Sequence, residues 1–159
     1  MATADLIQGT ELKGDAAHLD VATATRLGRA FGTVLRRRGG GGAKVVVLAR
    51  GGDGEELPVR DGLARGLVLT GHEVHDLGVA SEAQLAVAVD RLEAAGAAQV
   101  PPVSEGVRRV RFLLGRRPLG DEVLAELAAL ADGDDFSAGT GSLVLVDPRQ
   151  PSRSAGARG

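Results

Sequence analysis

The stretch that decides the fold is Lys44-Val45-Val46-Val47-Leu48. A short continuous run of apolar, mostly β-branched residues is typical of a strand that is buried on both faces. Glycines precede this run, and a Gly- and Asp-rich loop at residues 49–56 follows it. We therefore expect the central strand of a sheet, entered and left through loops.

The segments on either side of this strand alternate between helix and strand. Residues 57–69 are expected to form a helix that ends at Thr70-Gly71, and residues 73–77 the next strand. Upstream, apolar residues recur at three- and four-residue spacing from Asp20, a suitable N-cap, and the pattern stops at the glycines 39–42. This alternation predicts βαβ units and a largely parallel sheet with right-handed crossovers.

More elements are expected toward the C-terminus. They are a helix that Ser81 caps and that runs up to Gly96, strands at 97–100 and 110–114, a helix that Asp121 opens, and a last strand at 142–146. The predicted fold class is α/β, a three-layer αβα sandwich with a mixed, mainly parallel sheet. We expect one domain over residues 1–147. A tail at 148–159, rich in Pro, Ser, Gly and Arg, is expected to be disordered.

Composition excludes several classes of function. With a formal net charge of −2 and a pI near 5.9, the chain has no global field that attracts nucleic acid or an anionic membrane. It has no cysteine, so a thiolate nucleophile and cysteine-ligated metals are excluded. No stretch has the length of a signal peptide's apolar region or of a membrane span. We predict a soluble cytoplasmic protein with neither a nucleic-acid nor a membrane partner.

No metal and no cofactor are expected. His72 and His75 are three residues apart in a strand pattern, which predicts that they point to opposite faces of the sheet. The Asp-rich run at 132–135 follows a predicted helix, so we interpret it as a solvated turn and not as a magnesium loop.

The densest basic feature surrounds the loop after the strand at 97–100. Five arginines lie between positions 108 and 117, close to Ser104 and Glu105. The ordinary interpretation is a pair of solvated strand ends, and the functional one is an anion-binding rim that Arg108 and Arg109 contribute to. Ser104 is the candidate nucleophile. Glu105 is a candidate general acid or base, although an exposed loop glutamate is its ordinary interpretation.

The string Gly71-His72-Glu73-Val74-His75-Asp76-Leu77-Gly78 is the most specific of several local motifs. Others are Leu27-Gly28-Arg29-Ala30-Phe31-Gly32, Gly62-Leu63 with Gly66-Leu67, Arg117-Pro118-Leu119, and Asp135-Phe136. Together they resemble domain I of the α-D-phosphohexomutases, the phosphomannomutase/phosphoglucomutase family. The resemblance covers about residues 7–147 and implies the family's domain I fold.

The resemblance also implies a chemistry for the intact family, in which a phosphoserine of domain I exchanges its phosphoryl group with a hexose phosphate and domain II holds a magnesium ion. The family reads Thr-Ala-Ser-His-Asn-Pro after its strand. This chain reads Pro101-Pro102-Val103-Ser104-Glu105-Gly106, which puts Val103 in the place of the phosphoserine. The two prolines fix the backbone and remove two N–H donors.

The family's anion-binding positions are retained in part. Lys13 stands where the family's Tyr-Asp-Ile-Arg-Gly has its arginine, and a lysine cannot reproduce the bidentate contact of arginine with a phosphate. Arg50 stands in the place of the Gly-Arg-Asp loop, whose acidic member is absent. We therefore expect Lys13, Arg50, Arg108 and Arg109 to be the residues that contact an anionic ligand.

Three functions stay open at this point, in order of preference. The first is a catalytically degenerate, stand-alone domain I that acts as a binding or scaffolding protein. The second is a small enzyme repurposed in the old cleft, for example in specialised metabolism. The third is a residual phosphosugar mutase that needs other subunits, because one domain carries only one of the family's four active-site loops.

The expected partner is a second copy of the chain in a two-fold dimer, or another protein. The resemblance implies that a second domain would begin near residue 147, and the surface that it covers needs another cover if it is apolar. Residues 142–146 are apolar toward both faces and invite strand pairing if they lie at the sheet edge. An interior strand is the alternative. An anionic small molecule is the other expected ligand.

Overall fold

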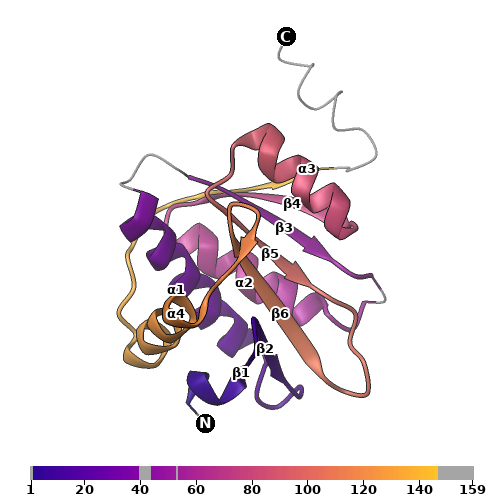
Figure 1. Ribbon diagram of the computed structural model, residues 1–159, viewed down its shortest axis with the longest axis vertical. Helices are drawn as coiled ribbons and strands as arrows, with labels where there is room; N and C mark the ends of the chain where they lie inside the picture. The colour runs from indigo at the N-terminus through magenta and orange to yellow at the C-terminus, as the bar shows by residue number, and fades with distance from the viewer. Residues whose placement is uncertain (1, 40–43, 53, 147–159) are drawn as a thin grey trace.

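The computed structural model describes residues 2–39, 44–52 and 54–146 (Figure 1). Its helices are the short 3-10 helix η1 (Thr3–Leu6), α1 (Val21–Gly39), α2 (Leu57–Leu69), α3 (Glu82–Leu92) and α4 (Asp121–Gly133). Its strands are β1 (Ile7–Gln8), β2 (Glu11–Gly14), β3 (Val45–Arg50), β4 (Glu73–Val79), β5 (Gly96–Val100), β6 (Arg108–Leu114), β7 (Arg117–Pro118) and β8 (Ser142–Leu145). No helix in the described residues is long and apolar enough to cross a membrane.

The strands form one mixed sheet in the order β1-β2-β6-β5-β3-β4-β8, with β7 beside β6. The core is parallel, since β3 pairs in parallel with β5 and β4, and β4 with β8. The outer neighbours β1, β2, β6 and β7 pair antiparallel, as do β5 and β6. Strand β3 has a neighbour on each edge, and its residues 46–49 are fully buried. The predicted central strand is confirmed.

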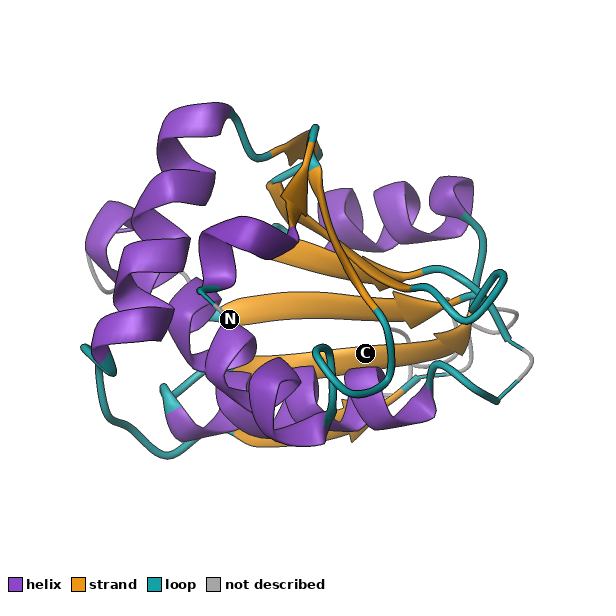
Figure 2. Cartoon of the chain, turned by 90° about the horizontal axis from the view of Figure 1, so that it is seen from below, coloured by secondary structure: helices purple, strands orange, loops and turns teal. Residues whose placement is uncertain are grey.

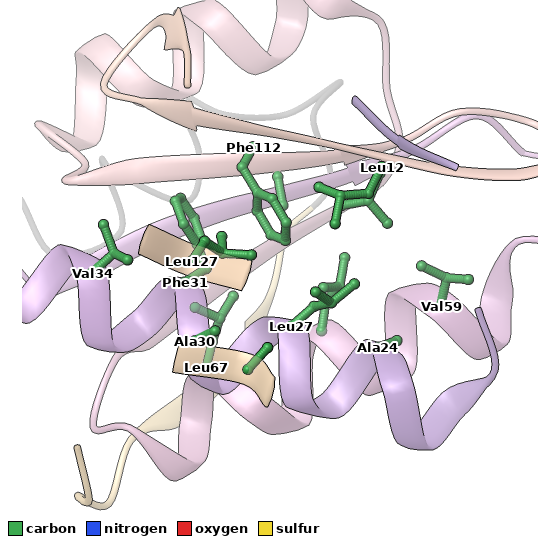
Figure 3. Packing of buried hydrophobic residues seen from close by; sticks show 14 of the residues in the cluster. Leu12, Ala24, Leu27, Ala30, Phe31, Val34, Val59, Leu67, Phe112 and Leu127 are labelled. Carbon is green, nitrogen blue, oxygen red and sulfur yellow. The ribbon is translucent and has the colours of Figure 1, made fainter. Parts of the chain in front are cut away.

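Helices lie on both faces of the sheet (Figure 2), which confirms the predicted fold class. On one face α1, α2 and α4 bury the larger apolar cluster, which includes Phe31, Phe112 and Leu127 (Figure 3). The ring centroids of Phe31 and Phe112 are 4.5 Å apart. On the other face α3 covers a smaller cluster that includes Val47 and Leu85. Burial on both faces explains why β3 is apolar at every position from 45 to 49.

Helices α1 and α2 approach each other closely because glycines lie at their contact. A Cβ atom at Gly28 would lie 2.6 Å from the carbonyl oxygen of Leu63, and one at Gly66 only 2.3 Å from that of Thr25. Real Cβ atoms do not come closer than 3.0 Å to such neighbours. The side chains at a contact set the distance between two helices, so these glycines fix the position of α1 on α2.

Two predicted helix caps are confirmed. The Asp20 carboxylate accepts a hydrogen bond of 2.8 Å from the backbone N–H of Thr23, and this bond lowers the pKa of Asp20 below its ordinary value. Ser81 and Gln84 form a reciprocal capping box at the start of α3. The helix begins at the residue after the cap in both cases.

Several boundaries differ from expectation. Arg50, expected in a loop, is the last residue of β3. Gly96, expected at the end of a helix, begins β5, and Arg108 begins β6 two residues before the predicted start. The sequence pattern does not show β1 and β2, because they are short and β2 pairs with the distant β6. The tail predicted at 148–159 lies outside the described residues.

The Asp-rich run at 132–135 ends α4 and is exposed, as expected for a solvated turn, but its carboxylates also bond to neighbouring helices. Asp132 accepts a 2.6 Å hydrogen bond from the hydroxyl of Thr3 and another from its backbone N–H, so it ties η1 to α4. Asp134 and Asp135 face arginines of α1 at 3.3 and 3.5 Å. The run is therefore a structural junction between three helices.

Candidate functional site

The candidate site lies where the parallel strands β5, β3 and β4 end. The chain places β4 on one side of β3 and later β5 on the other, so the strand order reverses between β3 and β5. In open α/β sheets, ligands bind outside the carboxyl ends of the strands at such a reversal. The connections 51–56 and 101–107 follow β3 and β5 and flank this point.

The two connections pack directly against each other. The backbone N–H of Gly51 donates to the carbonyl of Val100 at 2.8 Å. A Cβ atom at Gly51 would lie 2.1 Å from Cδ of Pro102, so the proline ring rests on the Gly51 backbone. The ring fills the space beside Gly51.

Glu56 organises the connection between β3 and α2. Its side chain is buried, and it accepts hydrogen bonds from the backbone N–H groups of Gly52 at 2.7 Å and Gly54 at 3.1 Å. It also pairs with the guanidinium of Arg50 at 2.8 Å. Arg50, a predicted anion contact, is thus held by a carboxylate of its own chain. The sequence pattern does not single out Glu56, because a glutamate in a Gly- and Asp-rich loop has the features of a surface residue.

A second ion pair, with a buried carboxylate, joins α2 to β4. The Asp76 carboxylate accepts from the Arg60 guanidinium at 2.6 Å and from the backbone N–H of Gly78 at 2.8 Å. Burial lowers the pKa of Arg60, but its hydrogen bond to Asp61 and the charge of Asp76 outweigh burial and leave the pKa above its ordinary value. Asp76 and Gly78 belong to the most specific sequence motif. Their role here is structural, since the aspartate holds the end of β4 and the glycine has a positive φ of 70°.

Ser104 and Glu105 lie in a tight two-residue turn between β5 and β6. Ser104 and Val107 exchange backbone hydrogen bonds of 3.2 and 2.9 Å, and the central residues Glu105 and Gly106 have φ values of 52° and 76°. Two successive positive φ angles are typical of a type I′ hairpin turn. Both Ser104 and Glu105 are exposed, and within the described residues the Ser104 hydroxyl has no hydrogen-bond partner.

The other predicted cations have different surroundings. Arg108 donates to the carbonyl of Leu19 at 2.9 Å. Lys13 lies 3.6 Å from the Glu11 carboxylate. Lys13 and Arg109 are directly opposite each other on β2 and β6. Arg109 has no ion-pair partner in the part of the chain that the structure describes, and its Nε is buried without a hydrogen bond.

A shallow hollow of about 410 Å³ lies beside these connections, lined by Ala16, Gly54, Glu55, Pro58, Val103, Gly106 and Arg108. Of the six residues that the sequence proposes for the site, it includes Arg108 alone. Ser104 and Glu105 lie in the hairpin turn, and Arg50 is paired with Glu56. Lys13 and Arg109 lie opposite each other on the adjacent strands β2 and β6. The proposed residues share one end of the sheet but do not converge on this hollow.

Residues 6–102 match the family model described as phosphoglucomutase/phosphomannomutase, alpha/beta/alpha domain I. The chain belongs to this family. The matched stretch ends at Pro102, the residue that packs on Gly51. No curated protein sequence matches the chain.

Solved structures of two family members have the same fold. A phosphoglucomutase/phosphomannomutase family protein from Burkholderia thailandensis superposes with a TM-score of 0.83 at 21% identity, over 98% of this chain and 36% of its own. A putative phosphomannomutase from Thermus thermophilus superposes with a TM-score of 0.71 at 28% identity and the same coverage. The chain therefore spans 36% of the length of each of these two proteins.

Proposed function

We propose that this phosphomutase domain I does not transfer phosphoryl groups by itself and acts as a binding or scaffolding protein. The observation that carries the proposal is the contact of Pro102 with Gly51 at the reversal in strand order. A phosphate bound at the end of a sheet relies on backbone N–H groups that point at it. Pro101 and Pro102 have none, and the N–H of Gly51 is used by Val100.

The surroundings of Ser104 support the same proposal. A serine nucleophile needs a neighbour that accepts its proton, and phosphoryl transfer needs cations placed around the moving phosphoryl group. Among the described residues no base contacts the Ser104 hydroxyl, while Arg50 is paired with Glu56 and Arg108 with a carbonyl. Catalysis of this kind depends on positioning, and the hairpin turn places Ser104 on an exposed surface.

Weak binding of an anionic small molecule is the part of the family's chemistry that the proposal retains. Lys13 and Arg109 are cross-strand neighbours of like charge, an arrangement that costs stability. An anion between them removes this repulsion. Glu11 offsets the charge of Lys13 only in part, because it is also 3.5 Å from Arg111.

The test of the catalytic part is incubation with a hexose 1,6-bisphosphate and magnesium, followed by mass spectrometry of the intact protein. We expect no covalent phosphoryl group under conditions in which an intact family mutase acquires one. A phosphoryl group that appears in the chain and is lost in Ser104→Ala contradicts the proposal and supports a residual mutase.

Anion binding is tested with inorganic phosphate against chloride at equal ionic strength. We expect phosphate to raise the melting temperature of the native chain and not that of the double variant Lys13→Gln, Arg109→Gln. The matched control is Arg117→Gln, which removes an exposed arginine with no ion pair among the described residues and retains the response. An undiminished response in the double variant rules out Lys13 and Arg109 as the anion contacts.

A further inference from the structure

Strand β8 forms an apolar edge of the sheet. It pairs only with β4 in the described structure and appears as the yellow strand in Figure 1. Leu143, Val144 and Leu145 are 49%, 36% and 77% exposed. Natural proteins protect an edge with charged residues, proline or a bulge, and β8 reads Ser-Leu-Val-Leu in regular register with β4.

The backbone of β8 shows which groups are free at this edge. Ser142 N–H donates to the carbonyl of His72, and Val146 N–H to that of Asp76. Groups of alternate residues point to opposite edges of a strand, so residues 142, 144 and 146 face β4. The N–H and C=O groups of Leu143 and Leu145 therefore point outward.

We propose that a second copy of this chain pairs with β8 antiparallel to it, about a two-fold axis through Val144. A two-fold axis perpendicular to the sheet keeps each face of the sheet on the same side, so each residue must meet one that projects from the same face. An axis at Val144 places Leu143 opposite Leu145 of the second copy, and by symmetry Leu145 opposite Leu143 of the second copy. The outward groups of both leucines then form four backbone hydrogen bonds across the axis.

The side chains fit this register. Leu143 pairs with Val74 of β4, and Leu145 pairs with Asp76 of β4. Val74 and Asp76 lie on the face of the sheet that α2 covers, because Val74 belongs to the larger apolar cluster and Asp76 pairs with Arg60 of α2. Val144 is the partner of His75 and lies on the face of α3. The pairing therefore joins apolar residues on both faces and brings no like charges together among residues 142–146. The proposed dimer does not depend on the proposed function.

The first test is concentration dependence. A pairing this short is at the small end of protein interfaces, so we expect a dissociation constant on the order of 100 μM. We expect sedimentation velocity at protein concentrations from about 5 μM to about 1 mM to show 16.2 kDa monomers at the low end and dimers at the high end. Amide exchange by NMR should slow at Leu143 and Leu145 as concentration rises. Monomers throughout, or dimers with unchanged exchange at both leucines, overturn the proposal.

The second test uses two variants at one position. Leu145→Pro removes an N–H that β4 does not use, so the chain should keep its far-UV circular dichroism and melt cooperatively but remain monomeric. Leu145→Val keeps the N–H and the apolar surface and should dimerise. A dimer of unchanged affinity in a folded Leu145→Pro variant overturns the proposal. If Leu145→Pro does not fold, Val144→Lys, which opposes two lysines at the axis, provides the same test.

Discussion

Replacing Gly66 with alanine tests the close packing of α1 on α2. The added Cβ atom would lie 2.3 Å from the Thr25 carbonyl oxygen, 2.6 Å from Arg29 N and 2.8 Å from Gly28 C, all of them backbone atoms. The helices must separate by about 0.7 Å before the first contact reaches the 3.0 Å limit. Overpacking of this kind costs about 3 kcal/mol. Alanine regains about 1 kcal/mol of helix propensity, so we expect a net loss of about 2 kcal/mol.

The assay is urea-induced unfolding followed by far-UV circular dichroism, with the free energy of unfolding extrapolated to water. Gly133→Ala is the matched control, because it lies in α4 and its added Cβ atom meets nothing within 4 Å. The control should be unchanged or up to about 1 kcal/mol more stable. If Gly66→Ala is as stable as the native chain, the helices are not held together by the glycine contact.

Two further predictions concern single carboxylates. Glu56→Ala leaves Arg50 and two glycine N–H groups without their buried partner, and urea unfolding should show a loss of about 3–5 kcal/mol, whereas Glu56→Gln keeps an acceptor and should lose less. Asp20→Ala removes the cap of α1 and should cost about 1 kcal/mol. The native pKa of Asp20 is lowered, so the stabilisation is complete above the unfolded-state pKa and is lost as pH falls through the native one. We therefore expect a smaller stability difference between the native chain and Asp20→Asn at about pH 3 than at about pH 7. An equal stability difference at the two pH values contradicts this prediction.

Elements that depend on local pattern could be predicted from the sequence. The β-branched run before Leu48 identified the central strand because a strand buried on both faces must be apolar throughout. Asp20 and Ser81 identified two helix starts because a cap acts within a few residues of itself. Strands β1 and β2 were not predicted, because both are short and β2 pairs with the distant strand β6.

The candidate site was less predictable. The sequence indicated which end of the sheet to consider, and Ser104, Arg50 and Arg108 do lie in or beside its connections. It did not show that Glu56 holds Arg50, or that Pro102 packs on Gly51. Both contacts join groups whose local sequence is typical of an exposed loop, and only the folded backbone brings them together.

By itself the sequence determined the fold class and the central strand, because both follow from residue type and spacing. The departure of the loop at 101–106 from the family motif follows from the resemblance to the family. The position of β8 was left open, since a strand that is apolar toward both faces fits an interior and an edge equally well. The tertiary structure placed it at the edge beside β4. Strand order is decided by which helices cover which face of the sheet, and that depends on contacts between segments far apart in the chain.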